Sequence, residues 1–172
     1  GNSGYSSPAL LTLAGKQQIV AFVGAAVLGI NPVNGTELWR YAYVTDYDCN
    51  TATPVQIDEA SVLISAAENH GSTILKISKA GDAFRATSSW SSLGKNSVLR
   101  AEWQTPALAD GHLFALDNIG SAGPITSLVC VRVADGEQLW TQNRFGKSNL
   151  TLADGKLFIS TMKGELAIVK AS

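Results

Sequence analysis

Short apolar stretches separated by turn residues recur along the whole chain. The clearest are residues 106–116 (PALADGHLFAL) and residues 150–160 (LTLADGKLFIS), each with two apolar stretches around an Asp-Gly pair. Asp-Gly readily adopts the positive φ angles of a tight hairpin turn. Both segments therefore predict β-hairpins, whereas no stretch shows the periodicity of an amphipathic helix.

The hairpins belong to a longer repeat. Three segments begin alike, at Ser7-Pro8, Thr53-Pro54 and Thr105-Pro106, and Ser148-Asn149 holds the same place without the proline. Successive starts are 46, 52 and 43 residues apart (8 to 54, 54 to 106, 106 to 149). This spacing is close to the ~40–50 residues of one β-propeller blade.

The hairpin turns of the first two units are weaker versions of Asp-Gly. The first unit has Ala14-Gly15 and the second has Asp58-Glu59. The longest apolar run, residues 19–30, contains two glycines and is shorter than the ~20 residues of a membrane span. It therefore predicts a buried hairpin and no membrane span.

Each complete unit ends on a tryptophan after a further glycine turn. Residues 29–39 (GINPVNGTELW) match residues 130–140 (CVRVADGEQLW) position for position, and Gly81 and Trp90 are their counterparts in the second unit. An indole on the last strand of a blade can dock against the neighbouring blade and donate its N–H to a carbonyl.

We therefore expect Trp39, Trp90 and Trp140 to be mostly buried, as structural residues that dock one blade on the next. Replacing Trp140 by Ala should destabilise the fold by roughly 3–5 kcal/mol, the usual cost of truncating a buried tryptophan.

The predicted fold is all-β, a β-propeller of about four blades, each a four-stranded antiparallel sheet. The expected blades span residues 1–45, 46–95, 96–145 and 146–172. The last is incomplete, because its third strand falls near residues 165–169 and no tryptophan strand follows. The polar, Gly-rich segment 1–6 is a poor candidate for the missing strand.

The Gly-x-x-x-Trp ends resemble the pyrroloquinoline-quinone-type propeller repeat, whose blades end in Ala-x-Asp-x-x-Thr-Gly-x-x-x-Trp. Gly35, Trp39, Gly136 and Trp140 fit this motif. Other motif positions depart from it: Asn31 and Asn34 replace its Asp and Thr, and Arg132 and Asp135 differ further.

The resemblance covers essentially the whole chain and is strongest to bacterial quinoprotein-like propellers, related to outer-membrane assembly propellers and often labelled dehydrogenase-like. Such propellers have seven or eight blades, so the chain is similar to the C-terminal half of an eight-bladed ring. The resemblance also implies a periplasmic or cell-envelope location.

The charge balance excludes one class of partner. Formal net charge is −1, and the Lys and Arg residues are scattered singly. No basic field is therefore present to hold nucleic acid.

The two cysteines point to no metal site or disulfide framework. Cys130 lies in an apolar run, which predicts a small buried side chain, whereas Cys49 lies in a polar loop and is expected to be more exposed. No Cys/His spacing of a zinc site is present.

In a propeller, the loops that enter each innermost strand share one face with the loops between the second and third strands. Ligands commonly bind to that face, which we call the top face. The candidate loops are residues 41–51, 91–104 and 141–147, together with residues 66–72, 117–126 and 161–164.

The loop around Glu68, Asn69 and His70 contains residue types of an acid-base or metal pair, although one His and one Glu in a turn are more typical of solvated surface. Asp46 and Asp48 alternate in another loop and are of the type that binds Ca²⁺, but the final Glu of an EF-hand is missing.

The third candidate is an anion-binding funnel lined by Arg100, Arg144 and Lys147. Isolated cations on loops are more often a matter of solubility. No residue is assigned a catalytic or metal-binding role.

Three functional hypotheses remain open. The first is a non-catalytic scaffold for protein interaction or ligand binding, with no cofactor. The second is part of a quinone-dependent dehydrogenase or polysaccharide-related enzyme whose site needs the missing half. Under this hypothesis alone, the resemblance implies pyrroloquinoline quinone and calcium. The third is a propeller fragment without independent function.

The adjacent cysteines that such quinone enzymes often have do not occur here, and no Asp can be matched to their catalytic position. The open ring also predicts a partner, either a second copy that completes it or a chain that carries the missing blades.

Overall fold

The computed structural model describes residues 2–67, 70–119 and 125–172. The described chain forms four antiparallel sheets, and its only helices are two single turns of 3-10 helix, η1 (Asp46–Asp48) and η2 (Gly94–Asn96). None of the helices in these ranges is long and apolar enough to cross a membrane. The predicted all-β propeller of four blades is confirmed.

The strands of each sheet follow one another in chain order, so each sheet is one blade. The first is β1 (Ala9–Leu13), β2 (Lys16–Val23), β3 (Ala26–Ile30) and β4 (Glu37–Ala42); the second is β5 (Val55–Gln56), β6 (Ser61–Ala66), β7 (Gly71–Ala80) and β8 (Ala83–Leu93); the third is β9 (Ala107–Ala109), β10 (His112–Asn118), β11 (Thr126–Arg132) and β12 (Gln138–Gln142); the fourth is β13 (Ser148–Ala153), β14 (Lys156–Thr161) and β15 (Leu166–Lys170).

The predicted Asp-Gly turns are present. Asp110 and Gly111 have φ angles of 47° and 74°, and Asp154 and Gly155 have φ angles of 47° and 63°. Positive φ at both central residues defines the tight turn that matches the twist of a hairpin. Ala14 has φ of 51° in the first blade, where an alanine adopts this conformation without the help of an Asp or Asn side chain.

Successive blades pack face to face, and three apolar clusters fill the spaces between them. In β6, for example, Val62 and Ile64 contribute to the cluster between blades 1 and 2, whereas Leu63 contributes to the cluster between blades 2 and 3. Adjacent side chains of a strand point to opposite faces of the sheet. Blades 2 and 3 therefore bury apolar residues on both faces, which explains their near-continuous apolar strands.

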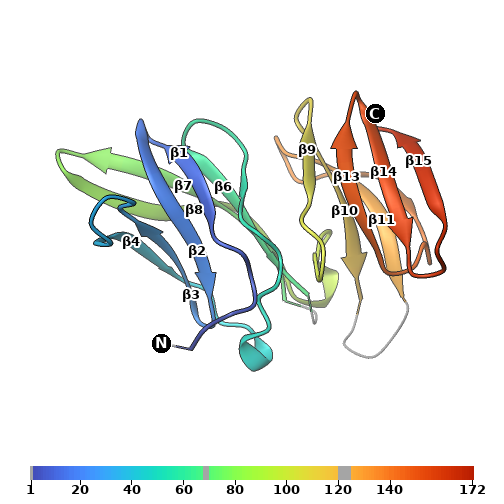
Figure 1. Ribbon diagram of the computed structural model, residues 1–172, viewed down its shortest axis with the longest axis horizontal. Helices are drawn as coiled ribbons and strands as arrows, with labels where there is room; N and C mark the ends of the chain where they lie inside the picture. Colours follow the sequence, from blue (N-terminus) through green and yellow to red (C-terminus); the bar gives the residue numbers. More distant parts are fainter. Residues whose placement is uncertain (1, 68–69, 120–124) are drawn as a thin grey trace.

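The first and last blades each bury only one face. Figure 1 shows the first blade, in blue, and the fourth, in red, at opposite sides of the molecule. Residues paired across neighbouring strands point to the same side, so the register identifies the uncovered faces. The end face of blade 1 consists of Leu10, Ile19, Ala21, Leu28 and Ile30, and the end face of blade 4 consists of Phe158, Leu166 and Ile168.

The three tryptophans lie where the repeat predicts them, one in each apolar cluster between blades. Trp39 is 4% exposed, and its indole Nε1 donates a hydrogen bond of 2.6 Å to Oε1 of the buried Gln18. Trp90 and Trp140 are half-buried. A Cβ atom on Gly136 would lie 2.1 Å from Nε1 of Trp90, so the indole requires a glycine in the next blade.

The N-terminal segment does not extend the fourth blade. The backbone N–H of Tyr5 donates to the carbonyl of Asn50, and the N–H of Gly24 donates to the carbonyl of Asn2. The segment therefore lies against the loops of blade 1, as its composition led us to expect.

Of the two cysteines, Cys130 is fully buried as predicted, and burial raises the pKa of its thiol. Cys49 is half-buried, so the prediction that it is the more exposed cysteine is correct. Neither cysteine forms a disulfide.

Candidate functional site

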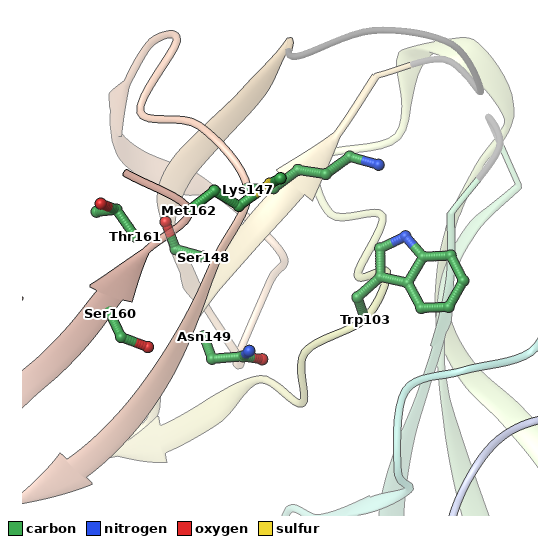
Figure 2. Close-up of a pocket in the computed structure, with 7 residues that line it drawn as sticks. All are labelled: Trp103, Lys147, Ser148, Asn149, Ser160, Thr161 and Met162. Atoms are coloured by element: carbon green, nitrogen blue, oxygen red, sulfur yellow. The ribbon is translucent and has the colours of Figure 1, made fainter. Parts of the chain in front are cut away.

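A hollow on the top face lies between the loops of blades 3 and 4. It has a volume of about 340 Å³ and is shown in Figure 2. Trp103 stands on one side, on the loop that enters β9, and the polar side chains of blade 4 stand on the other. We call this hollow the Trp103 pocket; it is lined by Trp103, Lys147, Ser148, Asn149, Ser160, Thr161 and Met162.

Trp103 is held in an unusual conformation. Its φ is +56°, in the left-handed region that bulky residues rarely adopt, and its side chain is 59% exposed. The backbone N–H of Trp103 donates to Oγ1 of Thr51 at 3.2 Å, which ties the loop to the equivalent loop of blade 2. Strained backbone concentrates at ligand-binding positions, so an exposed indole on strained backbone marks this loop as a binding candidate.

A buried polar group forms the floor of a smaller hollow next to the Trp103 pocket. The side-chain amide of Asn118 donates to Oε2 of Glu102, and Oγ1 of Thr126 donates to Oδ1 of Asn118 at 3.1 Å. Nζ of Lys147 lies 3.7 Å from the same Oε2 of Glu102. Glu102 and Asn118 are buried, so the half-exposed ammonium is the part of this group that a ligand can reach.

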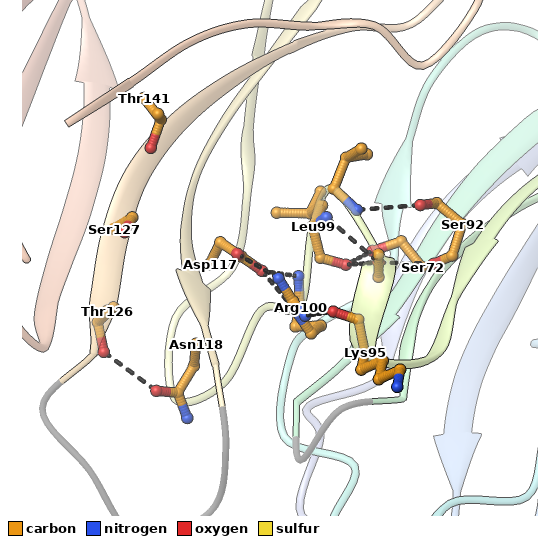
Figure 3. A network of polar contacts seen from close by, with 12 residues as sticks. Ser72, Ser92, Lys95, Leu99, Arg100, Asp117, Asn118, Thr126, Ser127 and Thr141 are labelled. Carbon is orange, nitrogen blue, oxygen red and sulfur yellow. Dashed lines mark hydrogen bonds and ion pairs between the residues drawn. The ribbon is translucent and has the colours of Figure 1, made fainter. Parts of the chain in front are cut away.

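A buried ion pair supports the loop from below (Figure 3). Nε and Nη2 of Arg100 donate to Oδ1 and Oδ2 of Asp117 at 2.8 and 2.7 Å, and Nη1 donates to the carbonyl of Lys95 at 2.8 Å. Both side chains are buried. Because Asp117 and Lys95 engage its guanidinium, Arg100 holds the loop to β10 and does not line an open funnel.

Blade 2 holds the same loop from the other side. Oγ of Ser72 donates to the carbonyl of Leu99 at 2.7 Å, and the backbone N–H of Ala101 donates to Oγ of Ser65 at 2.8 Å. The loop is thus fixed by β6 and β7 on one side and by β10 on the other. A residue on it, Trp103 included, is positioned by rigid strands.

His70 and Asp46, which come from two separate candidate loops, are close enough to affect each other. Partial burial lowers the pKa of His70, and the nearby negative charge of Asp46 opposes that shift. The imidazole lies 4.6 Å from the ring of Tyr43, measured between centroids. Glu68 and Asn69, the other members of that candidate loop, lie outside the described residues.

The remaining candidates occupy separate places. Asp48 accepts a hydrogen bond of 2.7 Å from Nδ2 of Asn2, and Arg144 is exposed with φ of 56°. Within residues 2–67, 70–119 and 125–172, no three His, Cys, Asp or Glu residues gather as metal ligands would.

The sequence identified the loops of this pocket but not its most exposed aromatic residue. Trp103 is the one tryptophan that does not lie on the outer strand of a blade, since the other three lie in β4, β8 and β12. That departure is the signal that points to it. The Trp103 pocket offers an aromatic face, one ammonium group and several hydroxyl and amide groups, a set that is suited to binding a ligand.

The comparison with protein families agrees with this architecture. Residues 1–142 match the family described as outer membrane protein assembly factor BamB. The chain belongs to this family. The resemblance to quinoprotein-like propellers is thereby confirmed. No curated protein matches the chain.

Solved structures with a similar fold include a designed protein and a natural enzyme. The computationally designed Ika4 protein is 12% identical with a TM-score of 0.65, over 97% of this chain and 92% of that chain. Quinohemoprotein alcohol dehydrogenase from Comamonas testosteroni is 13% identical with a TM-score of 0.55, over 83% and 21%. BamB from Moraxella catarrhalis is 16% identical with a TM-score of 0.46, over 89% and 61%. The chain spans less than two thirds of the two natural proteins.

Proposed function

We propose that this BamB-type propeller segment is a non-catalytic scaffold whose end faces bind a partner protein that completes the ring. The partner is a second copy of this chain or a chain that carries the missing blades. Membership in a family named for outer membrane assembly supports both a protein partner and a location in the cell envelope.

The observation that carries this proposal is a set of equivalent positions in blades 3 and 4. Leu128 and Cys130 pair with Leu116 and Phe114 in blade 3, where blade 4 covers them, and they are 2% and 0% exposed. The equivalent residues of blade 4, which pair with Ser160 and Phe158, are Leu166 and Ile168, and they are 67% and 58% exposed.

The outer face of blade 4 therefore has the apolar residues of a face that packs against another blade, but no blade covers it. Exposed apolar surface of this kind is typical of an interaction site. The end face of blade 1 offers the matching surface, because in a ring that side of each blade receives the preceding one. Covering both end faces would bury on the order of 1,000 Å² or more, the scale of a specific interface.

The test of the non-catalytic role is quinone binding. The purified protein is mixed with pyrroloquinoline quinone and calcium and passed over a gel-filtration column. The proposal predicts that the absorbance of the quinone separates from the protein. Stoichiometric retention would instead support the quinone-dependent enzyme, and the scaffold would have to be abandoned.

A further inference from the structure

The indole of Trp103 lies outside the apolar clusters that pack the blades together. Each of the three clusters of the described residues contains one of the other tryptophans, and none contains Trp103. The equivalent position of blade 2 is Thr51, because the 52 residues from 51 to 103 equal the spacing of Pro54 and Pro106. The blade therefore does not require a large ring at this position. Since the loop is held by its hydrogen bond to Thr51, the ring is in place before a ligand arrives.

The opposite wall of the Trp103 pocket is polar and comes from blade 4 (Figure 2). Ser148 and Thr161 are paired across β13 and β14, two residues from the pair of Leu150 and Ile159, which belongs to the apolar cluster between blades 3 and 4. Side chains two residues apart lie on the same face of a strand, so both hydroxyls are on the side of the sheet that faces blade 3. They consequently meet Trp103 between two neighbouring blades of one chain, whatever covers the outer face of blade 4.

The polar wall can both donate and accept hydrogen bonds. Oγ of Ser148 donates to the carbonyl of Gly146 at 3.1 Å, so its oxygen keeps lone pairs that can accept a hydrogen bond from a ligand. The half-exposed ammonium of Lys147 is a donor, and the amide of Asn149 and the hydroxyl of Ser160 add groups of both kinds. This mixture matches a ligand whose own polar groups are both donors and acceptors.

The charges at the pocket compensate each other. Nζ of Lys147 lies 3.7 Å from Oε2 of the buried Glu102. Among the described residues that line the pocket, Lys147 is the only cation. Phosphate and carboxylate groups are usually held by bidentate arginines, and the guanidinium of Arg100 is already bound to Asp117. The electrostatics therefore favour an uncharged ligand.

We propose that the Trp103 pocket binds a neutral saccharide through one pyranose ring. A pyranose has C–H groups on its flat faces and hydroxyl groups around its edge. The C–H groups suit the electron-rich face of an indole, and the hydroxyls, which both donate and accept, suit the polar wall of blade 4. The volume of about 340 Å³ is at the lower end of the range of small-molecule sites, which limits the ligand to a small saccharide or one end of a longer one.

This site is separate from the end faces, so the inference goes beyond the proposed scaffold function and does not rest on it. Both walls of the pocket belong to blades that the chain contains. A saccharide could therefore bind whether or not a partner protein completes the ring.

The probe is cellobiose, a neutral disaccharide whose ring hydroxyls are equatorial, so that the faces of its rings carry only C–H groups. Binding to the full chain is followed by NMR of the four indole N–H signals. We expect the Trp103 signal to shift saturably with a millimolar dissociation constant, because hydrogen bonds to the sugar replace hydrogen bonds to water. The signal of the buried Trp39 should stay in place. The signal that disappears in Trp103→Tyr identifies Trp103.

A matched control separates the pocket from exposed aromatic residues in general. Trp103→Ala should weaken cellobiose binding at least about tenfold, and Trp103→Tyr, which keeps an aromatic face, should retain most of the affinity. Tyr47→Ala is the control, because Tyr47 is also exposed, has φ of 65° and does not line the pocket. It should bind cellobiose as the parent does. Titration calorimetry measures the affinities, and circular dichroism with a melting curve confirms that the variants fold.

Two further ligands test the neutral chemistry. Glucuronate carries a carboxylate on a glucose ring, and it should bind no more tightly than glucose does. The affinity for cellobiose should be the same at about 0.05 M and about 0.5 M salt, because no net charge is exchanged. Tighter, salt-sensitive binding of glucuronate would make Lys147 the centre of an anion site and would overturn the proposal. Binding of N-acetylphenylalanine amide without binding of cellobiose would assign the pocket to a protein side chain and would also overturn it.

The proposal would equally fail if cellobiose left the Trp103 signal unchanged, or if Trp103→Ala and Tyr47→Ala lost the same affinity. Sedimentation of the same samples reports separately on covering the end faces. Failure of the saccharide site and failure of the scaffold are therefore distinguishable.

Discussion

Blades 3 and 4 begin with nearly the same sequence and have different surroundings. Both contain the pattern Ala-Asp-Gly-x-Leu-Phe, both turn at an Asp-Gly pair with positive φ, and both pair their first three strands in order. Phe114 is fully buried in blade 3, whereas the equivalent Phe158 is only half-buried in blade 4. The difference arises from what lies next to each sheet, since the local sequence is shared.

The comparison teaches that the repeat specifies the hairpins and that the neighbouring blade determines burial. Substitutions at equivalent positions of an enclosed and an open blade should therefore have different costs.

The tryptophans should show the largest effect. Trp39→Ala should destabilise the fold by about 3–5 kcal/mol, because it empties a closed junction and leaves buried Gln18 without its donor. Trp140→Ala should cost less than this range, since part of its indole already meets solvent. Urea denaturation of both variants measures the difference. Equal costs would mean that the last junction is as closed as the first.

The buried ion pair comes next. Asp117→Ala should destabilise the fold by about 3–5 kcal/mol, because Arg100 would remain buried without its carboxylate. Thr161 occupies the equivalent position in blade 4, and Thr161→Ala should cost only about 0.5–1.5 kcal/mol, the usual value of a hydrogen-bonded hydroxyl. Thermal melting of the two variants compares their losses of stability. An Asp117→Ala variant as stable as the parent would contradict the structural role of the ion pair.

Apolar truncation tests the third strands of the two blades. Leu128→Ala should cost about 2–5 kcal/mol, because it leaves a cavity in the cluster between blades 3 and 4. Leu166→Ala should change stability by no more than about 0.5 kcal/mol in the isolated chain, since its side chain is mostly exposed. A large cost at Leu166 under dilute conditions would show that its face is already covered.

The smallest expected effect is a pH dependence in blade 2. Burial places the pKa of His70 in the folded chain below its ordinary value of 6.5, so the unfolded chain binds the proton more readily. Stability should therefore be complete above about pH 6.5 and should fall as the pH decreases from there toward the lowered pKa of the folded state. In urea titrations across this window, His70→Phe should flatten the dependence; an unchanged slope would assign it to another group.

The sequence predicted the fold well because the repeat makes each element visible several times. The Asp-Gly turns, the register of Trp39 with Trp140 and the missing fourth strand were all readable in this way. The degree of burial was not, because Trp39 is buried and Trp90 and Trp140 are only half-buried although all three hold the same place in the repeat.

The candidate site was harder to predict, because loops repeat less than strands. The register indicated which loops share the top face, but not that Arg100 turns inward to Asp117 while Trp103 turns outward. Those orientations follow from contacts with Ser65, Ser72 and Thr51, which are distant in sequence. A single amino-acid sequence contains no pattern that shows which distant residues will contact each other.

The most direct test of the open end faces is sedimentation velocity of the purified chain at micromolar concentration, with Leu166→Asp as the control. The variant changes an exposed residue, so it should fold and sediment near the 18.1 kDa of one chain. The parent should form a larger species. Its two end faces carry apolar residues at positions that are buried between blades in the rest of the molecule, and association would cover them. A clean monomer of the parent, with no partner and no aggregation, would contradict the account.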